Sequence, residues 1–273
     1  MKERIMKIWV FGCSFTRYYW PTWADILRWS NPNIEVVNMA EMGLGNQRIF
    51  WRMQEAKLKG YIADSDLTIA VWAAWHREDR FVDDQWTVGN IFNSGKYCDT
   101  FINKYWDEHL DIIRNASSII SANDLLDISH NGSMIKVGKR EEYNGSNVPV
   151  TLDYRKYFNQ YNHYTSNFPN IIEFDHSTSN YFNNKCHDRH PDIMCHYDYY
   201  KKVQRSIPEL KDADEGLIYD MQQSITDAIN PDLKGRELYT VMIESIEKFI
   251  PNWKQDIGLH EWKWQLPING FVC

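Results

Sequence analysis

Short apolar runs alternate with amphipathic stretches along most of the chain. The run Lys7–Phe11 carries β-branched and aromatic side chains and is too short for a buried helix, so it predicts a strand that stops at Gly12. Trp23–Leu27 places apolar residues at the i, i+3, i+4 spacing of one helix face, and Ile34–Asn38 has the composition of a second strand. A strand, a helix and a strand in this order predict a βαβ unit, which favours a parallel sheet.

The same reasoning predicts further elements. Asp66–Ala73 is nearly continuous in apolar character, as expected of a strand buried on both faces. The other predicted elements are helices over about 47–59 and 100–126, strands over 133–138 and 170–174, and helices over about 191–204, 215–229 and 234–250. The helix over 100–126 has a candidate interruption at 115–123. Residues 80–100 are predicted to be irregular, and residues 139–168 to form an inserted loop or lid.

These elements predict an α/β protein, a three-layer α/β/α sandwich with a parallel sheet of about five strands. The main domain is expected to span residues 1–206, with the inserted loop or lid within it. Residues 207–273 are expected to form a helical C-terminal extension. That extension either docks on the main domain or serves as a small partner-binding module.

Composition narrows the class of protein. The 273 residues are 43% hydrophobic, which supports a sizeable core, and the net charge of −7 without a basic block disfavours a nucleic acid as the main partner. No run of about 18 apolar residues occurs, so no membrane span is expected. The N-terminal stretch is too short for a secretory signal, and the odd number and scattered spacing of the five cysteines indicate reduced thiols, so a cytoplasmic location is expected.

Candidate catalytic residues follow the predicted strands. Ser14 comes two places after Gly12, at the sheet edge where open α/β sheets place their chemistry. A serine hydroxyl needs a base to act as a nucleophile at neutral pH. His190, after the last predicted strand, is the best candidate base, and Asp188 is close enough to orient its imidazole.

The loop after the second strand offers candidate oxyanion donors. Two glycines there precede Asn46, which is also a candidate N-cap for the following helix. An oxyanion hole would then combine the backbone N–H groups of Ser14 and Gly43 with the Asn46 side chain. No step of such chemistry needs a cofactor or a metal.

Other roles for the same residues are open. Ser14 alone could satisfy a turn, and Cys13 beside it is an alternative nucleophile, although its side chain is expected to point away from that of Ser14, into the sheet. A cluster of cysteines and histidines over residues 186–196 is a candidate zinc site, although its spacing differs from the usual C-x2-C pattern. His196 within it is expected to pack on its helix.

Three short motifs at the strand ends resemble the SGNH (GDSL-like) hydrolase family. Gly-Cys-Ser at 12–14 resembles the first block of the family, Gly-Asp-Ser, with Cys in place of Asp. Residues 38–46 resemble the second block, which supplies a glycine N–H to the oxyanion hole, and Asp-Arg-His-Pro at 188–191 resembles the last block, which supplies the acid and the base. The resemblance covers roughly residues 6–205. The combination of these motifs is similar to that of family members found in bacteriophage genomes. It implies a flavodoxin-like α/β/α fold and an esterase activity.

The sequence departs from this family pattern in two places. The third block of the family ends in an Asn that donates to the oxyanion, whereas the third strand here runs into Trp-Ala-Ala-Trp-His-Arg at 72–77; Asn46, Trp75 or Arg77 are the candidate replacements. The acid and base are separated by one residue instead of two, so Asp192 is an alternative to Asp188. Trp75, Arg77 and Thr16 are also candidate substrate contacts.

The leading hypothesis is a serine hydrolase that cleaves a carboxylic ester, with an O-acetyl group on a glycan as the example that the resemblance implies. The expected partner is a small-molecule or glycan ester, with neither nucleic acid nor membrane, and with an oligomeric state that the sequence leaves open. The first alternative is a catalytically weak or inactive binding or virion-associated module on the same fold, favoured by the missing Asn. The second is a metal-binding protein built on residues 186–196.

Overall fold

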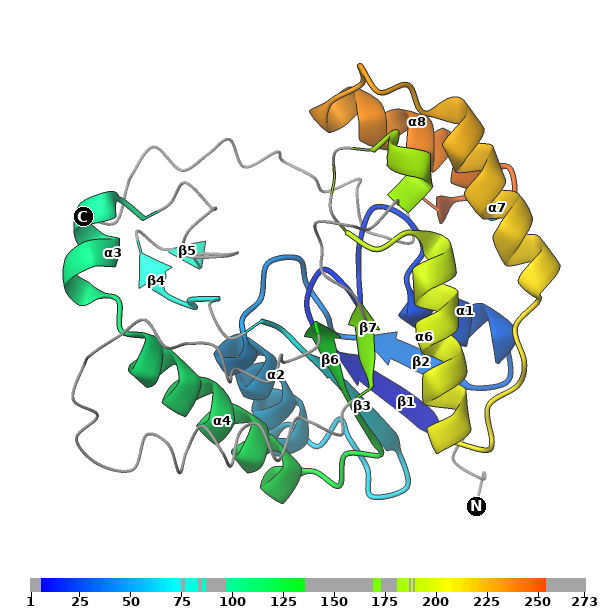
Figure 1. The fold of residues 1–273 in the computed structure, drawn as a ribbon. Coiled ribbons are helices and arrows are strands. Elements are labelled where there is room, and N and C mark those ends of the chain that lie inside the picture. The colour runs from blue at the N-terminus through cyan, green and yellow to red at the C-terminus, as the bar shows by residue number, and fades with distance from the viewer. Residues whose placement is uncertain are drawn as a thin grey trace.

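Five parallel strands form the central sheet, in the order β2-β1-β3-β6-β7 (Figure 1). The strands are β1 (Lys7–Phe11), β2 (Glu35–Asn38), β3 (Leu67–Trp72), β6 (His130–Ile135) and β7 (Asn170–Ile172). The computed structural model describes residues 6–74, 77–82, 85–86, 97–135, 169–172, 181–186, 188 and 190–253. This strand order is that of a doubly wound sheet, in which ligands bind beyond the carboxyl ends of the strands where the order reverses, here between β1 and β3.

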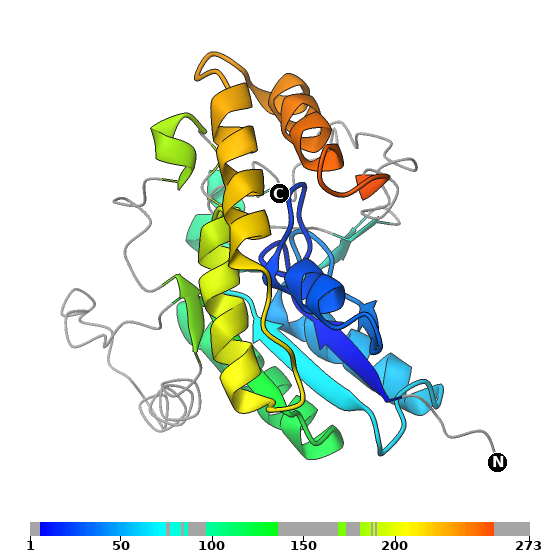
Figure 2. The ribbon, with the colours of Figure 1, turned by 90° about the vertical axis from the view of Figure 1, so that its right-hand side faces the viewer.

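Helices cover both faces of the sheet. Helices α1 (Trp23–Ser30) and α6 (Ile193–Ser206) pack together on one face, and α2 (Asn46–Leu58) and α4 (Glu108–Leu125) pack together on the other (Figures 1 and 2). Two further helices, α7 (Glu215–Ala228) and α8 (Gly235–Glu247), pack on each other, and α7 also contacts α6. The predicted α/β class, three layers and five parallel strands are confirmed.

Two predictions between the third and fourth strands of the sheet are wrong. The stretch predicted to be irregular contains a short antiparallel pair, β4 (Phe81–Val82) and β5 (Gln85–Trp86). The predicted helix over 100–126 is two helices, α3 (Asp99–Tyr105) and α4, which break at residues 106–107 instead of at 115–123.

The position of this break follows from side-chain hydrogen bonds. Trp106 is extended and ends α3, and the Asp107 carboxylate accepts from the backbone N–H of Leu110 at 3.1 Å, as an N-cap does. Asn115 and Asn123 remain inside α4 because each donates its side-chain amide to the carbonyl four residues earlier, at 2.6 and 2.8 Å. The asparagines therefore do not interrupt the helix.

Several predicted segments are partly or wholly outside the described residues. The inserted loop or lid over 139–168 lies there, as do the ends of the strands predicted over 133–138 and 170–174. A short 3-10 turn, η2 (Tyr181–Asn184), precedes the loop that leads to α6. None of the helices in the described ranges is both long and apolar enough to cross a bilayer.

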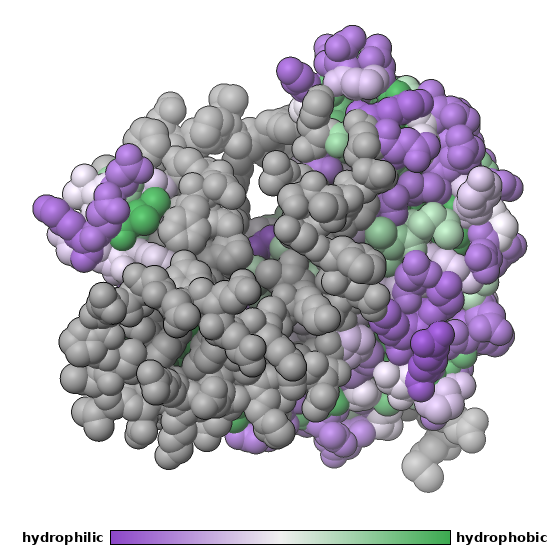
Figure 3. Space-filling model, viewed as in Figure 1, coloured by the Kyte–Doolittle hydropathy of each residue, from purple (hydrophilic) through white to green (hydrophobic). Residues whose placement is uncertain are grey.

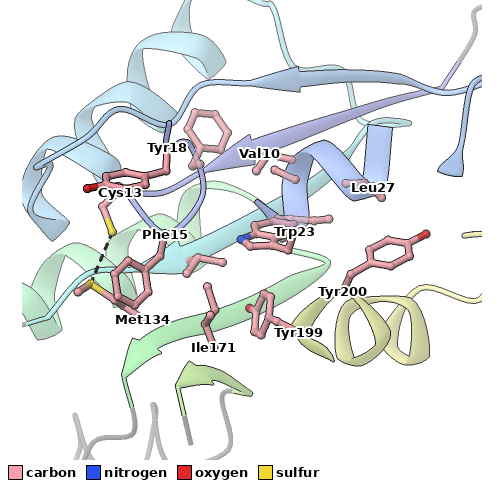
Figure 4. Close-up of a cluster of buried hydrophobic side chains, with 14 of the residues drawn as sticks. Val10, Cys13, Phe15, Tyr18, Trp23, Leu27, Met134, Ile171, Tyr199 and Tyr200 are labelled. Atoms are coloured by element: carbon pink, nitrogen blue, oxygen red, sulfur yellow. Dashed lines mark hydrogen bonds between the residues drawn. The ribbon is translucent and has the colours of Figure 1, made fainter. Parts of the chain in front are cut away.

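One continuous cluster of buried side chains links the sheet, its covering helices and the C-terminal helices. Members of α7 and α8, such as Met221 and Met242, belong to the same cluster as β1 and α6. Cys13 points into this core, with its Sγ 3.7 Å from the Sδ of Met134 on β6 (Figure 4). This is the orientation predicted for Cys13, away from the sheet edge, where it packs as a small apolar residue.

The chain turns sharply directly after β1. The backbone N–H groups of Thr16 and Arg17 both donate to the carbonyl of Cys13, at 2.9 and 3.2 Å. This turn brings the Thr16 side chain back over Gly12, where a Cβ atom would lie 2.2 Å from Thr16 Oγ1 and 3.2 Å from the carbonyl oxygen of Val71. Gly12 is therefore required by the close approach of the turn that carries Ser14.

Substitution Gly12→Ala should destabilise the fold. The added methyl group overlaps Thr16 and cannot move toward Val71, and such overpacking costs about 1–3 kcal/mol. The control is Gly216→Ala in the first turn of α7, where the nearest atom is an Asp214 oxygen at 3.3 Å, and there Ala should be neutral or stabilising by up to about 1 kcal/mol. Urea unfolding of both variants provides the test, and equal midpoints would contradict this account.

Candidate active site

Ser14 lies at the carboxyl edge of the sheet, in the turn after β1. Ser14 is 3% exposed. The chain leaving β2 continues alongside it, because Met39 N–H donates to Val10 O at 2.8 Å and Glu41 N–H to Gly12 O at 3.4 Å. The loops after β1 and β2 therefore meet at this edge, together with the loop before α6.

The structure brings Ser14, His190 and Asp188 together. His190 Nε2 lies 2.9 Å from Ser14 Oγ, and its Nδ1 lies 2.6 Å from Asp188 Oδ1. The backbone N–H of His190 also donates to Asp188 Oδ1, at 2.9 Å. Because a carboxylate can only accept, the Nδ1 proton points to Asp188 and leaves Nε2 free to accept the Ser14 hydroxyl proton.

The second oxygen of Asp188 is also fully engaged. Tyr18 and Tyr239 donate their hydroxyls to Asp188 Oδ2 at 2.5 and 2.6 Å. Burial raises the pKa of this carboxyl, but the hydrogen bonds and charge of His190 and the two tyrosine hydroxyls lower it more, so the pKa of Asp188 lies well below its ordinary value. The sequence analysis did not identify either tyrosine.

Aromatic rings fix the plane of the His190 imidazole. Tyr18 stacks on it with ring centroids 3.8 Å apart and an interplanar angle of 20°, and Phe15 meets it edge-on at 5.2 Å. Burial, followed by the charge of Asp188, raises the pKa of Tyr18 well above its ordinary value, so its hydroxyl stays a donor. The turn after β1 thus supplies both Ser14 and the walls that hold the histidine.

Asp192, the alternative acid, has a different role. It is the N-cap of α6, where its Oδ1 accepts from the backbone N–H of Cys195 at 3.0 Å. Its Oδ2 accepts from Gln222 on α7 at 2.9 Å. Both oxygens are therefore engaged away from the imidazole, and Asp188 is the carboxylate that contacts His190.

Asn46 is neither the cap of α2 nor a free oxyanion donor, so both predictions for its side chain are wrong. The N-cap is Gly45, and the Asn46 amide bonds both the N–H and the C=O of Ala73, at 2.7 and 3.0 Å. Its Nδ2 also donates to Asn115 Oδ1. Both amide hydrogens are therefore donated inside the core, where Asn46 is 1% exposed.

Asp79, from the chain beyond β3, accepts from the free backbone N–H groups at the start of α2 instead. Its two carboxylate oxygens accept from the backbone N–H groups of Gly45 and Arg48, at 2.9 and 3.0 Å. Asn46 and Asp79 together tie the segment after β3 to the first turn of α2. Burial raises the pKa of Asp79, and the two backbone donors oppose that rise.

Arg77 reaches the site from this anchored segment. Its Nη2 lies 3.4 Å from Ser14 Oγ, and its Nη1 donates to Leu44 O at 3.2 Å. Gly43, with φ 82°, directly precedes Leu44 in the same turn. Asn46, Trp75 and Arg77 were the candidates for the oxyanion donor that follows the third strand. Of these, Arg77 lies at the serine, and Trp75 lies outside the described residues.

Thr16 is not placed to touch a substrate, contrary to prediction. It is fully buried, and its hydroxyl lies against Gly12. Cys13 is also fully buried, with its sulfur in the core. Ser14 is the residue of this turn whose hydroxyl lies within hydrogen-bond distance of His190 Nε2.

Arg77 also lines a polar pocket together with Glu78 and Asp111. The buried carboxylates of Glu78 and Asp111 face each other in it, flanked by Arg114. Burial, together with Glu78, raises the pKa of Asp111 to about 7, although Trp106 donates to it. Sequence patterns gave no indication of this pair, because Glu78 lies beyond β3 and Asp111 lies within α4, far along the chain.

The described cysteines and histidines over 186–196 do not form a metal site. Burial raises the pKa of the Cys186 thiol to about 11 and lowers the pKa of His196 to about 3. His196 is fully buried in α6, as expected, and its ring nitrogens have no hydrogen-bond partner within the described residues. Over that same part of the chain, no three His, Cys, Asp or Glu side chains are arranged to hold a metal, and His187 lies outside it.

Comparisons with known proteins give matches in structure alone. No protein-family model and no curated protein sequence matches the chain. A member of the lipolytic protein G-D-S-L family from Veillonella parvula is similar in structure, with a TM-score of 0.43 and 16% identity over 75% of this chain and 100% of the other. The psychrotrophic esterase EstA from Pseudoalteromonas sp., in a structure inhibited by monoethylphosphonate, has a TM-score of 0.37 and 13% identity over 74% of this chain and 97% of its own.

Substitution Asp79→Ala should lower stability by removing the acceptor for two backbone donors at the start of α2. The loss of a helix cap costs about 0.5–2 kcal/mol. Asp64→Ala is the control, because the Asp64 side chain is 100% exposed and pairs with Lys57 at the surface, and it should change stability by less than about 0.5 kcal/mol. Thermal unfolding measures both, and an Asp79 variant as stable as the control would refute the capping role.

Proposed function

We propose that this protein is a serine hydrolase that cleaves a carboxylic ester. The observation that carries the proposal is the continuous hydrogen-bonded chain from Ser14 Oγ through His190 to Asp188, at 2.9 and 2.6 Å. A base within hydrogen-bond reach of a serine, itself oriented by a carboxylate, is the arrangement that activates a hydroxyl at neutral pH.

The reaction follows from the positions of the protons. His190 Nε2 accepts the Ser14 hydroxyl proton as Oγ attacks the ester carbonyl, and Asp188 stabilises the imidazolium that forms. His190 then gives that proton to the departing alcohol and leaves an acyl-serine. Water, deprotonated by the same histidine, hydrolyses the acyl-serine and restores Ser14. These steps need no cofactor.

The negative charge on the carbonyl oxygen needs donors at the same edge of the sheet. We assign this task to the backbone N–H groups of Ser14 and Gly43 and to the guanidinium of Arg77. Arg77 replaces Asn46 in this role, because both amide hydrogens of Asn46 are donated to Ala73 and Asn115. A guanidinium that donates to Leu44 O keeps further N–H groups for the reacting oxygen.

The proposed substrate is a small-molecule or glycan ester, with an O-acetyl group as the acyl part to test first. The motif resemblance supports the ester, and a small acyl group fits a serine that is almost fully buried. The net charge of −7 supports a partner other than a nucleic acid.

A fluorophosphonate probe, which reacts with activated serines, tests the nucleophile. The wild type should be labelled at Ser14, and Ser14→Ala and His190→Ala should each abolish labelling. Ser206→Ala at the C-terminal end of α6 is the control and should label as the wild type does, because the exposed Ser206 hydroxyl donates to Lys202 O of its own helix. A folded wild type that resists the probe would favour a binding module on the same fold.

Substitution Arg77→Lys should lower kcat for a small acyl ester by about 100- to 1000-fold, as loss of one oxyanion donor does in other hydrolases. Lysine keeps the charge but cannot donate to Leu44 and the reacting oxygen through one planar group. Arg28→Lys on the surface of α1 is the control and should leave kcat unchanged. If kcat is retained while KM alone rises, Arg77 binds the substrate and does not stabilise the oxyanion.

A further inference from the structure

Helix α8 reaches the Asp188 carboxylate through Tyr239. The inner face of the helix is buried through Leu238, Met242 and Ile246, which fixes its position against the core. The Tyr239 ring lies on that of Tyr19, with centroids 3.9 Å apart, and its hydroxyl is 2.6 Å from Asp188 Oδ2. Packing therefore holds the hydroxyl in place from the side opposite to His190.

Helix α7 holds the two ends of the segment that carries Asp188 and His190. Gln222 accepts from the Ile193 N–H at 3.1 Å and donates to Asp192 at 2.9 Å, next to the start of α6. Lys185 donates its ammonium to the carbonyl of Thr226 at 2.8 Å, before Asp188. The loop that supplies the proposed acid and base is thus bound to the C-terminal helices on both sides of the reacting residues.

The C-terminal helices direct their apolar side chains inward. Figure 3 shows that the surface over α6, α7 and α8 in this view is mostly hydrophilic, with small apolar areas. In Figures 1 and 2, α8 stands above the loop that follows β1, at the carboxyl end of the sheet. This arrangement is that of a structural support for the site and not of an apolar face built to receive another protein.

We propose that Tyr239 is a positioning residue for the Ser14–His190–Asp188 triad, so that α7 and α8 form part of the catalytic apparatus. The proposal rests on the hydrolase function proposed above. Two hydroxyls on Oδ2, from Tyr18 and Tyr239, prevent the carboxylate from rotating and leave Oδ1 to His190. A carboxylate held at both oxygens keeps the imidazole in the tautomer and plane that the reaction needs.

The same hydroxyl affects the protonation of Asp188. Within the part of the chain that the structure describes, the titratable groups that face Asp188 are His190 and Cys186 on its own segment, Tyr18 and Tyr19 after β1, and Tyr239 on α8. Removing the Tyr239 donor raises the pKa of Asp188 toward its ordinary value. The change is therefore read from the titration of the Asp188 carboxyl itself, because the ionised form is favoured less once one of its donors is removed.

Substitution Tyr239→Phe keeps the ring and its packing on Tyr19 but removes the hydroxyl. We expect kcat, and the rate of reaction with a fluorophosphonate probe, to fall about tenfold with KM within about twofold, as loss of a hydrogen bond to a charged group predicts. Tyr219→Phe is the matched control, because Tyr219 on α7 is 57% exposed, and it should leave the rate and KM unchanged.

A second measurement does not depend on catalysis. Carboxyl carbon NMR of the full chain, with Asp188 assigned through Asp188→Asn, should show Asp188 titrating at higher pH in Tyr239→Phe than in the wild type. If the wild type resists the probe but the Asp188 titration still differs between the wild type and Tyr239→Phe, the hydrolase function is refuted and the positioning contact is kept. A reactive wild type with an unchanged rate and an unchanged Asp188 titration in Tyr239→Phe refutes the role of Tyr239.

A third variant covers failure of Tyr239→Phe to fold. Site-specific 3-fluorotyrosine at position 239 retains the hydroxyl and nearly the same shape, so the fold should be kept. Its fluorine signal should change when Asp188 is replaced by Asn, because the charged acceptor of the hydroxyl is then lost. An unchanged signal would show that the hydroxyl does not bind Asp188 in solution, which overturns the proposal.

Discussion

A buried carboxylate is stable only where donors replace the water it has lost, and the site of this protein is built on one such carboxylate. Asp188 accepts from the imidazole and the backbone N–H of His190 and from two tyrosine hydroxyls. These donors come from the loop after β1, the segment before α6 and the C-terminal helix α8. The burial cost of one charge therefore requires three distant parts of the chain to meet at one edge of the sheet.

The parallel sheet makes that meeting possible, and a second polar network secures the neighbouring edge. All five strands end on the same side, so the loops after β1, β2 and β3 converge there. Asn46 pairs with both backbone groups of Ala73 just beyond β3, and Asp79 from the following segment binds two N–H groups at the start of α2. Arg77 lies between these anchors, which explains how a long, flexible side chain can be held beside Ser14.

The parts that the sequence predicted are those with local signals. Strand and helix periodicity gave the α/β class and most elements, and a glycine-terminated strand drew attention to Ser14, which the structure places against His190 and Asp188. The exchange of roles between Asn46 and Asp79 was missed because capping rules consider only neighbouring residues. Asp79 reaches the helix start from the far side of β3, which leaves Asn46 for Ala73.

Tyr18 and Tyr239 could not be recognised for a related reason. A tyrosine in a polar turn or on an amphipathic helix has no spacing that separates a carboxylate ligand from an ordinary packed ring. Its role depends on which side chain lies beside it, and here that neighbour is set by the docking of α8 on the core. The sequence likewise left open whether the C-terminal residues form a docked extension, because an apolar helix face is the same whether it meets its own domain or a partner.

The charge of Arg77 distinguishes this site from one that uses a neutral amide donor. A guanidinium stabilises a developing oxyanion more strongly than an amide does, but it also attracts nearby carboxylates in the resting protein. Asp79 could compete for Arg77 in this way, since the two interact electrostatically, but its oxygens are already bound to Gly45 and Arg48 N–H groups. The helix start therefore engages the Asp79 carboxylate, and the guanidinium keeps its orientation toward Ser14.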